Sequence, residues 1–132
     1  MTSTVTPAAT VAARVIDAFQ TKTFDAEAFT ADATAWHNFD ELDLRIADSF
    51  AMVAAINAVV PDFTFAERRH LPATGEVSVA QYTLTGTLPD GSALRVPACL
   101  VVREVAGRVA RIEEYLDATQ LAPLVTALEA AG

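Results

Sequence analysis

The sequence has little of the chemistry that metal sites and disulfides need. Its 132 residues include a single cysteine, Cys99, and two histidines, His37 and His70, that lie 33 positions apart. One cysteine excludes an intramolecular disulfide, and so wide a spacing excludes a local zinc motif. We therefore expect no metal site, and we interpret Cys99 as a small buried strand residue and not as a nucleophile.

Basic residues are also scarce, with 9 Lys and Arg against 17 Asp and Glu and a net charge of −8. This balance opposes nucleic acid and anionic membranes as partners, because phosphate binding needs a basic surface. No apolar run approaches the roughly 20 residues that span a bilayer. Residues 1–13 lack the positive charge and continuous apolar core of a secretory signal. We expect a cytoplasmic protein.

Apolar residues are plentiful, at 52% of the chain. That composition and the length favour one domain with a single core. We expect residues 1–6 to be disordered and residues 7–132 to form that domain.

The hydrophobic periodicity changes along the chain from helical to alternating. It predicts helices over residues 7–21, 24–30, 45–59 and 119–130, and strands over 33–39, 63–72, 76–88, 92–105 and 108–117. Helices that are segregated from a run of consecutive strands are typical of an α+β domain with an antiparallel meander.

The first predicted strand carries an unusual set of polar and aromatic residues: Trp36, His37, Asn38 and, just after it, Asp40. Side chains alternate between the two faces of a strand, so either Trp36 and Asn38 or His37 face the interior. The sequence leaves both arrangements open.

The last predicted strand places Glu114 on the same face as Ile112 and Leu116. A carboxyl group between two apolar neighbours would be desolvated, which raises its pKa and makes it a candidate acid or base. The alternative is a structural ion pair with an arginine such as Arg69 or Arg95.

The order of elements, the stretch Ala33-Thr34-Ala35-Trp36-His37-Asn38 and the late stretch from Gly107 to Asp117 together resemble the nuclear transport factor 2-like superfamily. The most similar branch is the SnoaL-like, ketosteroid isomerase-like one. The resemblance implies an α+β cystatin-like cone, in which a curved, mostly antiparallel sheet wraps around the N-terminal helices and encloses a pocket. It also implies a homodimer.

The resemblance assigns His37 to the place of the ketosteroid isomerase base, and a histidine can accept a proton at neutral pH. That enzyme binds its oxyanion with a Tyr and an Asp. The corresponding positions here hold Val15 and Cys99, so steroid isomerisation is not expected. Limonene epoxide hydrolases match at Trp36, Asn38 and Glu114, but their Arg and Asp correspond to Gln81 and Thr83. SnoaL-type cyclases use a His and an Asp, for which His37 could pair with Glu114, Asp40 or Asp117.

The first functional hypothesis is an acid–base enzyme of the isomerase or cyclase type, without metal or organic cofactor, that acts on a small hydrophobic carbonyl compound. Its catalytic residues are His37 and Glu114. A pocket protein that binds an apolar ligand without catalysis is the alternative, and an epoxide hydrolase is a third possibility. The residues expected to bind the small molecule are Trp36, Asn38, Asp40, Phe50, Phe63, Gln81, Thr83 and Leu116.

Overall fold

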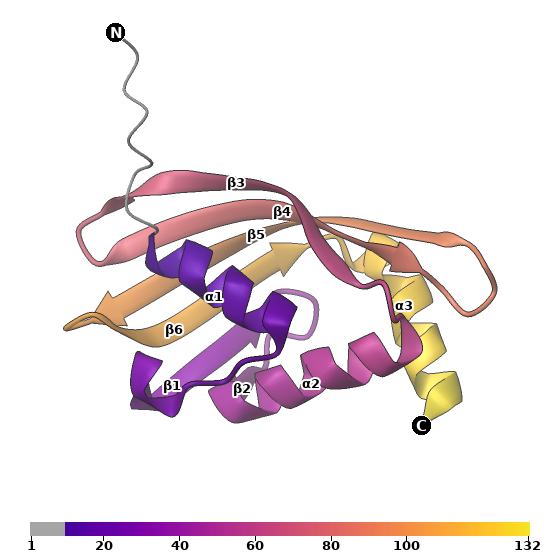
Figure 1. Ribbon diagram of the computed structural model, residues 1–132, viewed down its shortest axis with the longest axis horizontal. Coiled ribbons are helices and arrows are strands. Elements are labelled where there is room, and N and C mark those ends of the chain that lie inside the picture. The colour runs from indigo at the N-terminus through magenta and orange to yellow at the C-terminus, as the bar shows by residue number, and fades with distance from the viewer. Residues whose placement is uncertain (1–9) are drawn as a thin grey trace, which may run out of the picture.

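The computed structural model describes residues 10–132, so the disorder expected for residues 1–6 and the helix start expected at Pro7 lie outside the described residues. The described chain contains three helices, a short 3₁₀ turn and six strands (Figure 1). In chain order these are α1 (Val11–Thr21), η1 (Ala26–Ala28), β1 (Phe29–His37), β2 (Asp43–Arg45), α2 (Ile46–Val59), β3 (Thr64–Thr74), β4 (Val77–Thr87), β5 (Ala93–Val105), β6 (Arg108–Leu116) and α3 (Ala118–Ala131).

The six strands form one sheet in the order β2-β1-β6-β5-β4-β3. Only β1 and β6 pair in parallel, and every other pair is antiparallel. The sheet arches over the helices in Figure 1, with α1 packed against β3, β4 and β5 and with α2 packed against β1, β2 and α3. The expected α+β fold with a curved mixed sheet is therefore confirmed.

The core lies between the helices and the inner face of the sheet. Helix α1 begins where the Thr10 side chain accepts a hydrogen bond from the Ala13 N–H (3.1 Å), and it buries Val15, Ile16 and Phe19 against the strands. Burial of such side chains is the main stabilising contribution to the fold. Within residues 10–132, no helix is both long and apolar enough to cross a membrane.

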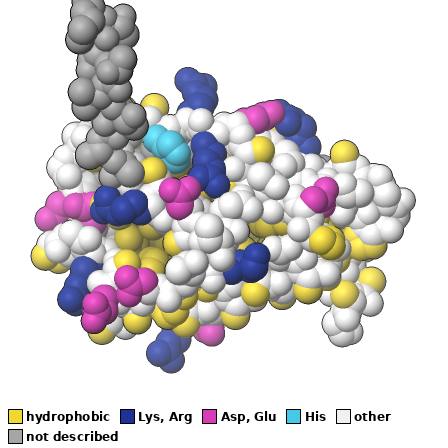
Figure 2. Space-filling model, viewed as in Figure 1, with side chains coloured by type: hydrophobic (Ala, Val, Ile, Leu, Met, Phe, Trp, Pro, Cys, Tyr) yellow, Lys and Arg dark blue, Asp and Glu magenta, His cyan; other side chains and the backbone are white. Residues whose placement is uncertain are grey.

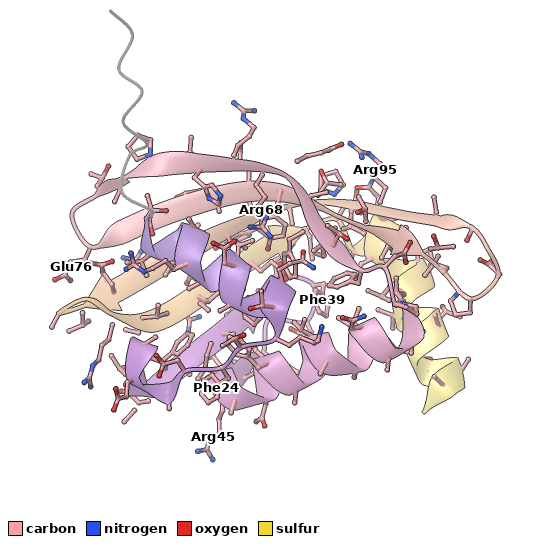
Figure 3. The ribbon with its side chains drawn as sticks, in the orientation of Figure 1. Phe24, Phe39, Arg45, Arg68, Glu76 and Arg95 are labelled. Atoms are coloured by element: carbon pink, nitrogen blue, oxygen red, sulfur yellow. The ribbon has the colours of Figure 1, made fainter. Side chains whose placement is uncertain are left out.

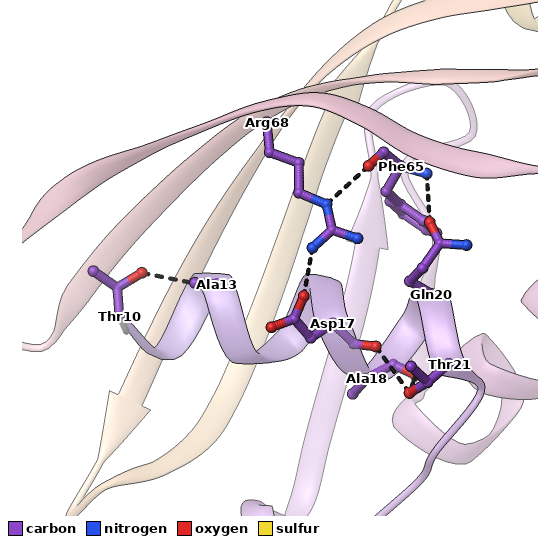
Figure 4. A network of polar contacts seen from close by, with 8 residues as sticks. All are labelled: Thr10, Ala13, Asp17, Ala18, Gln20, Thr21, Phe65 and Arg68. Atoms are coloured by element: carbon purple, nitrogen blue, oxygen red, sulfur yellow. Dashed lines mark hydrogen bonds and ion pairs between the residues drawn. The ribbon is translucent and has the colours of Figure 1, made fainter. Parts of the chain in front are cut away.

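Polar contacts fix β3 to α1 (Figure 4). Arg68 forms an ion pair with Asp17 and donates through Nε to the Phe65 carbonyl (2.8 Å). Gln20 accepts a hydrogen bond from the Phe65 N–H (2.7 Å). These contacts hold Phe65 against the core beside Phe19, with their ring centroids 6.2 Å apart.

A β-bulge in β3 changes which side chains face inward. Glu67 has a φ of 53°, and the pairing with β4 shifts between Ala66 and Arg69. The bulge turns Glu67 to the outer face, where it binds Thr83 and Arg95, while Arg68 reaches α1. A regular alternation would have placed Glu67 on the face of Phe65.

Two segments differ from the sequence-based prediction. The helix expected over residues 24–30 is only the 3₁₀ turn η1, and β1 begins earlier, at Phe29. Phe29 is buried and pairs with Val109 of β6, so sheet pairing overrides the local helical pattern. The acidic connection after Asp40 contains the short strand β2, which pairs with β1.

Candidate active site

The inner face of the sheet and the three helices enclose a cavity of ≈ 170 Å³. Its lining is apolar, with contributions such as Phe19 from α1, Val53 from α2, Leu100 from β5 and Leu124 from α3. The polar side chains that line it are those of His37, Ser49, Tyr82 and Glu114. A largely apolar pocket with a few convergent polar groups is the usual form of a small-molecule site.

Strand pairing brings three of these polar groups together. His37, the last residue of β1, lies directly opposite Glu114 of β6, and Glu114 lies opposite Leu100 of β5. Tyr82 of β4 follows two residues after Ala80, the partner of Leu100, and therefore points to the same face. Residues from strands distant in sequence thus meet at one position on the inner face.

Glu114 is the centre of this polar group. Its Oε1 lies 3.4 Å from His37 Nε2, and its Oε2 accepts a hydrogen bond from the Tyr82 hydroxyl. The His37 Nδ1 atom is buried and has no hydrogen-bond partner among the described residues. A separation of 3.4 Å is longer than an optimal hydrogen bond. Such loose contacts are common in sites without substrate.

Burial controls the protonation of the Glu114 and Tyr82 side chains. Desolvation raises the pKa of Glu114, although the neighbouring His37 and the Tyr82 hydrogen bond oppose this shift. Desolvation raises the pKa of Tyr82 well above its ordinary value, and the adjacent Glu114 charge adds to the effect. Tyr82 is therefore a hydrogen-bond donor at neutral pH, and the acid form of Glu114 persists to a higher pH than that of an exposed glutamate.

The cavity reaches the surface beside Phe39 and Val125. Both residues line it, and their exposures are 37% and 38%. Phe39 follows β1, and its ring centroid lies 5.3 Å from that of His37, on the helical side of the sheet (Figure 3). The polar group is thus close to the route by which a small molecule would enter.

The structure brings three of the sequence-predicted site residues to the cavity lining: His37, Glu114 and Phe63. Trp36 lies on the outer face, where its ring packs against Tyr115 with the centroids 5.4 Å apart. The Asn38 side chain hydrogen-bonds the Leu116 backbone in both directions, at 2.9 and 3.1 Å, and so extends the β1–β6 pairing.

The other expected ligand contacts lie elsewhere. Asp40 accepts a hydrogen bond from the Leu42 N–H (3.0 Å) in an exposed turn. Phe50 is buried against Phe19, with the ring centroids 4.4 Å apart, and Leu116 is buried outside the cavity lining.

Gln81 and Thr83 lie on the outer face of β4. Gln81 is exposed, and Thr83 donates a hydrogen bond to Glu67 (2.9 Å). The expectation that these two residues contact a ligand came from the epoxide hydrolase resemblance. The alternation in β4 directs Tyr82 and Leu84 inward instead.

The structure also decides between the partners considered for Glu114 and His37. Arg95 pairs with Glu67 on the outer face (2.7 Å; Figure 3), and Asp117 caps α3 by accepting from the Thr119 N–H (2.7 Å). Glu114 is therefore the carboxyl group beside His37.

Cys99, which was aligned with the isomerase oxyanion Asp, lies on the outer side of β5 opposite Gln81, where partial burial raises its thiol pKa. It does not line the cavity.

Sequence reasoning missed Tyr82 and Ser49. The signal for Tyr82 was present, because Ala80, Tyr82 and Leu84 form the apolar side of β4, whereas Gln81, Thr83 and Thr85 form the polar side. The apolar side faces the core, so the Tyr82 hydroxyl is buried there.

The fold is an α+β cone, and its pocket holds a buried carboxyl group, a histidine and a tyrosine. No family model matches the sequence, and no curated protein does. Solved structures do match.

Three of the matching structures show which kinds of protein share this fold. IdmH, a proposed polyketide cyclase from Streptomyces antibioticus, is 15% identical, with a TM-score of 0.72 over 88% of this chain and 96% of that one. A protein with a ketosteroid isomerase-like fold from Catenulispora acidiphila, solved in complex with trimethylamine, is 14% identical, with a TM-score of 0.69 over 92% and 95%. A proposed SnoaL-like polyketide cyclase from Jannaschia is 19% identical, with a TM-score of 0.65 over 91% and 90%. This similarity establishes the fold.

Proposed function

We propose that the protein is a cofactor-independent acid–base enzyme that moves a proton on a small, largely apolar carbonyl compound. The observation that carries the proposal is the pair formed by His37 Nε2 and Glu114 Oε1, which face each other at 3.4 Å at the lining of an apolar cavity. A base and an acid this close can act on adjacent atoms of one substrate.

In the proposed reaction, His37 is the base and Glu114 is the acid. The His37 Nε2 lone pair takes a hydrogen from the carbon next to the carbonyl group, and the electron pair of that C–H bond forms the C=C bond of an enol. The protonated Glu114 Oε1 donates its proton to the carbonyl oxygen at the same time. Where the substrate carries a further C=C bond beside that carbon, the product of this step is a dienol; return of the proton from His37 to its far carbon shifts that C=C bond into conjugation, and return of the enol proton to Glu114 restores the carbonyl group and completes an isomerisation. The same enol could attack a second carbonyl group in a cyclisation.

Tyr82 determines which oxygen of Glu114 acts as the acid. Its hydroxyl donates to Oε2, which leaves Oε1 as the oxygen that carries the proton. Burial raises the pKa of Glu114 and so keeps the acid form available at a higher pH than an exposed glutamate would allow.

The named relatives are consistent with this chemistry. Proposed polyketide cyclases are among the similar structures, and the Catenulispora protein was solved with a small organic molecule, trimethylamine. Since fold alone does not assign an activity, the proposal rests on the His37–Glu114 pair.

Hydrogen exchange in D₂O tests the proposal without knowledge of the natural substrate. Cyclohexanone is incubated with the protein, and the loss of its hydrogens next to the carbonyl group is followed by ¹H NMR. We expect exchange above the buffer rate that His37→Ala and Glu114→Gln each reduce by about a hundredfold or more. Glu129→Gln, which makes the same change at an exposed glutamate of α3, is the matched control and should leave the rate unchanged. Binding of cyclohexanone without exchange would refute catalysis and favour the alternative of a binding protein.

We also infer a homodimer formed through the outer face of the sheet. That face leaves apolar side chains partly exposed on β4, β5 and β6, among them Val79, Val101 and Tyr115. Light scattering of the purified protein should give a mass near twice that of the chain. A monomer at micromolar concentration would contradict this.

We expect the protein in the cytoplasm, where its single cysteine stays reduced.

A further inference from the structure

The cavity has a second polar point that the proposed reaction does not use. Ser49 lies on α2, and its hydroxyl has no hydrogen-bond partner among the described residues although the side chain is only 3% exposed. Buried hydroxyl groups are normally hydrogen-bonded, so an exception calls for an explanation.

Ser49 belongs to the face of α2 that lines the cavity. Ser49, Met52, Val53 and Ile56 follow one another at helical spacing, and all four are lining residues. Ser49 is the polar member of this stripe, and it lies on a helix, whereas His37, Tyr82 and Glu114 all lie on the sheet. The cavity therefore has polar groups on two of its walls.

The size of the cavity limits what can bind between these walls. Its volume is ≈ 170 Å³, and an engineered apolar cavity of about 150 Å³ accommodates benzene. A compound of one six-membered ring with a substituent is of the right size, whereas fused systems of three or four rings are too large.

We propose that Ser49 is a second polar anchor of the site, and that the ligand is a one-ring carbonyl compound with a further hydroxyl or carbonyl group that hydrogen-bonds Ser49. The position of the carbonyl group at Glu114 rests on the proposed function. The ligand supplies the hydrogen-bond partner that residues 10–132 do not provide for Ser49.

Two probes of equal size test the anchor: 4-hydroxycyclohexanone and 4-methylcyclohexanone. An apolar pocket binds the methyl compound better, because the hydroxyl group loses its hydration without compensation. With the Ser49 anchor, the wild-type protein should bind the hydroxyl compound about fivefold more tightly, as expected for one hydrogen bond. The Ser49→Ala variant should instead bind the methyl compound more tightly than the hydroxyl compound. Dissociation constants are measured by calorimetric or NMR titration.

Ser78 provides a matched control for stability. It is also 3% exposed, but its hydroxyl accepts a hydrogen bond from the Ala12 N–H (3.0 Å). Ser78→Ala should lower the melting temperature, since it leaves that N–H unpaired. Ser49→Ala should leave the melting temperature unchanged or raise it, because the lost hydroxyl has no partner.

A wild-type protein that prefers the methyl compound, shows no preference, or binds neither probe would overturn the proposal. A melting temperature that falls in Ser49→Ala as it does in Ser78→Ala would also overturn it. Failure of the proposed catalysis is seen separately: if the hydroxyl preference is present and depends on Ser49 but neither probe exchanges hydrogen, the anchor stands and the acid–base function does not.

Discussion

Replacing Tyr82 with phenylalanine removes one hydroxyl group from the centre of the site and keeps the ring. Tyr82 is 3% exposed, and its hydroxyl donates to Glu114 Oε2. In Tyr82→Phe, this buried oxygen has lost its donor, and loss of such a hydrogen bond costs about 1–3 kcal/mol. We expect the free energy of unfolding to fall by about 2 kcal/mol, which for a domain of this size lowers the melting temperature by roughly 7 °C.

The loss should depend on the ionisation of Glu114. A hydroxyl donor stabilises a carboxylate more than a carboxylic acid, so Tyr82→Phe raises the pKa of Glu114 further and the destabilisation grows as pH rises. Urea denaturation at several pH values measures this. Thr126→Ala, which removes a hydroxyl group from an exposed position of α3, is the control and should change the stability by less than about 0.5 kcal/mol. A Tyr82→Phe variant as stable as Thr126→Ala at every pH would refute the assigned hydrogen bond.

Three further outcomes follow from the structure. The pKa of Glu114 is higher in the native state than in the unfolded state, so the native state binds more protons at pH values between these two pKa values. The free energy of unfolding therefore falls as pH rises through that range. Glu114→Gln should lack this fall in denaturation curves recorded from acid to neutral pH. A Cβ added at Gly86 would lie 2.4 Å from Cγ1 of the fully buried Val60, so Gly86→Ala should lower the free energy of unfolding by about 1–3 kcal/mol in the same assay. The Arg95–Glu67 ion pair is exposed, so Arg95→Gln should lower the stability only slightly in the same assay, and about 1 M NaCl should remove the effect. An equal loss of stability at high salt would count against this.

Much of the fold was predictable, because α1 has a clear helical period and strands β3 to β6 largely alternate. Helix α2, the four consecutive strands β3 to β6 and α3 all lie close to their predicted ranges. The bulge at Glu67 and the early start of β1 at Phe29 were not predictable, because both depend on pairing with distant strands. Acidic and basic groups are mixed over the face seen in Figure 2.

The candidate site was only partly predictable. Alternation in β6 correctly grouped Glu114 with Ile112 as an inner residue, and the pairing of His37 with Glu114 was among the alternatives considered. Gln81 and Thr83 were chosen by resemblance against the local pattern, and the same pattern would have selected Tyr82. Ser49 gives no sequence signal, since a serine in the first turn of a helix is ordinary until its burial is known.

The protonation of Glu114 decides whether an acid stands beside His37, and it can be measured directly. Selective ¹³C labelling of the glutamate carboxyl carbons, with Glu114→Gln to assign the resonance, follows this one group through a pH titration by NMR. We predict an apparent pKa above the ordinary glutamate range, together with a titration that changes when His37 is replaced by alanine, because the two groups are coupled. A carboxyl group that titrates at or below the ordinary value, and that is insensitive to His37, would contradict the acid–base site.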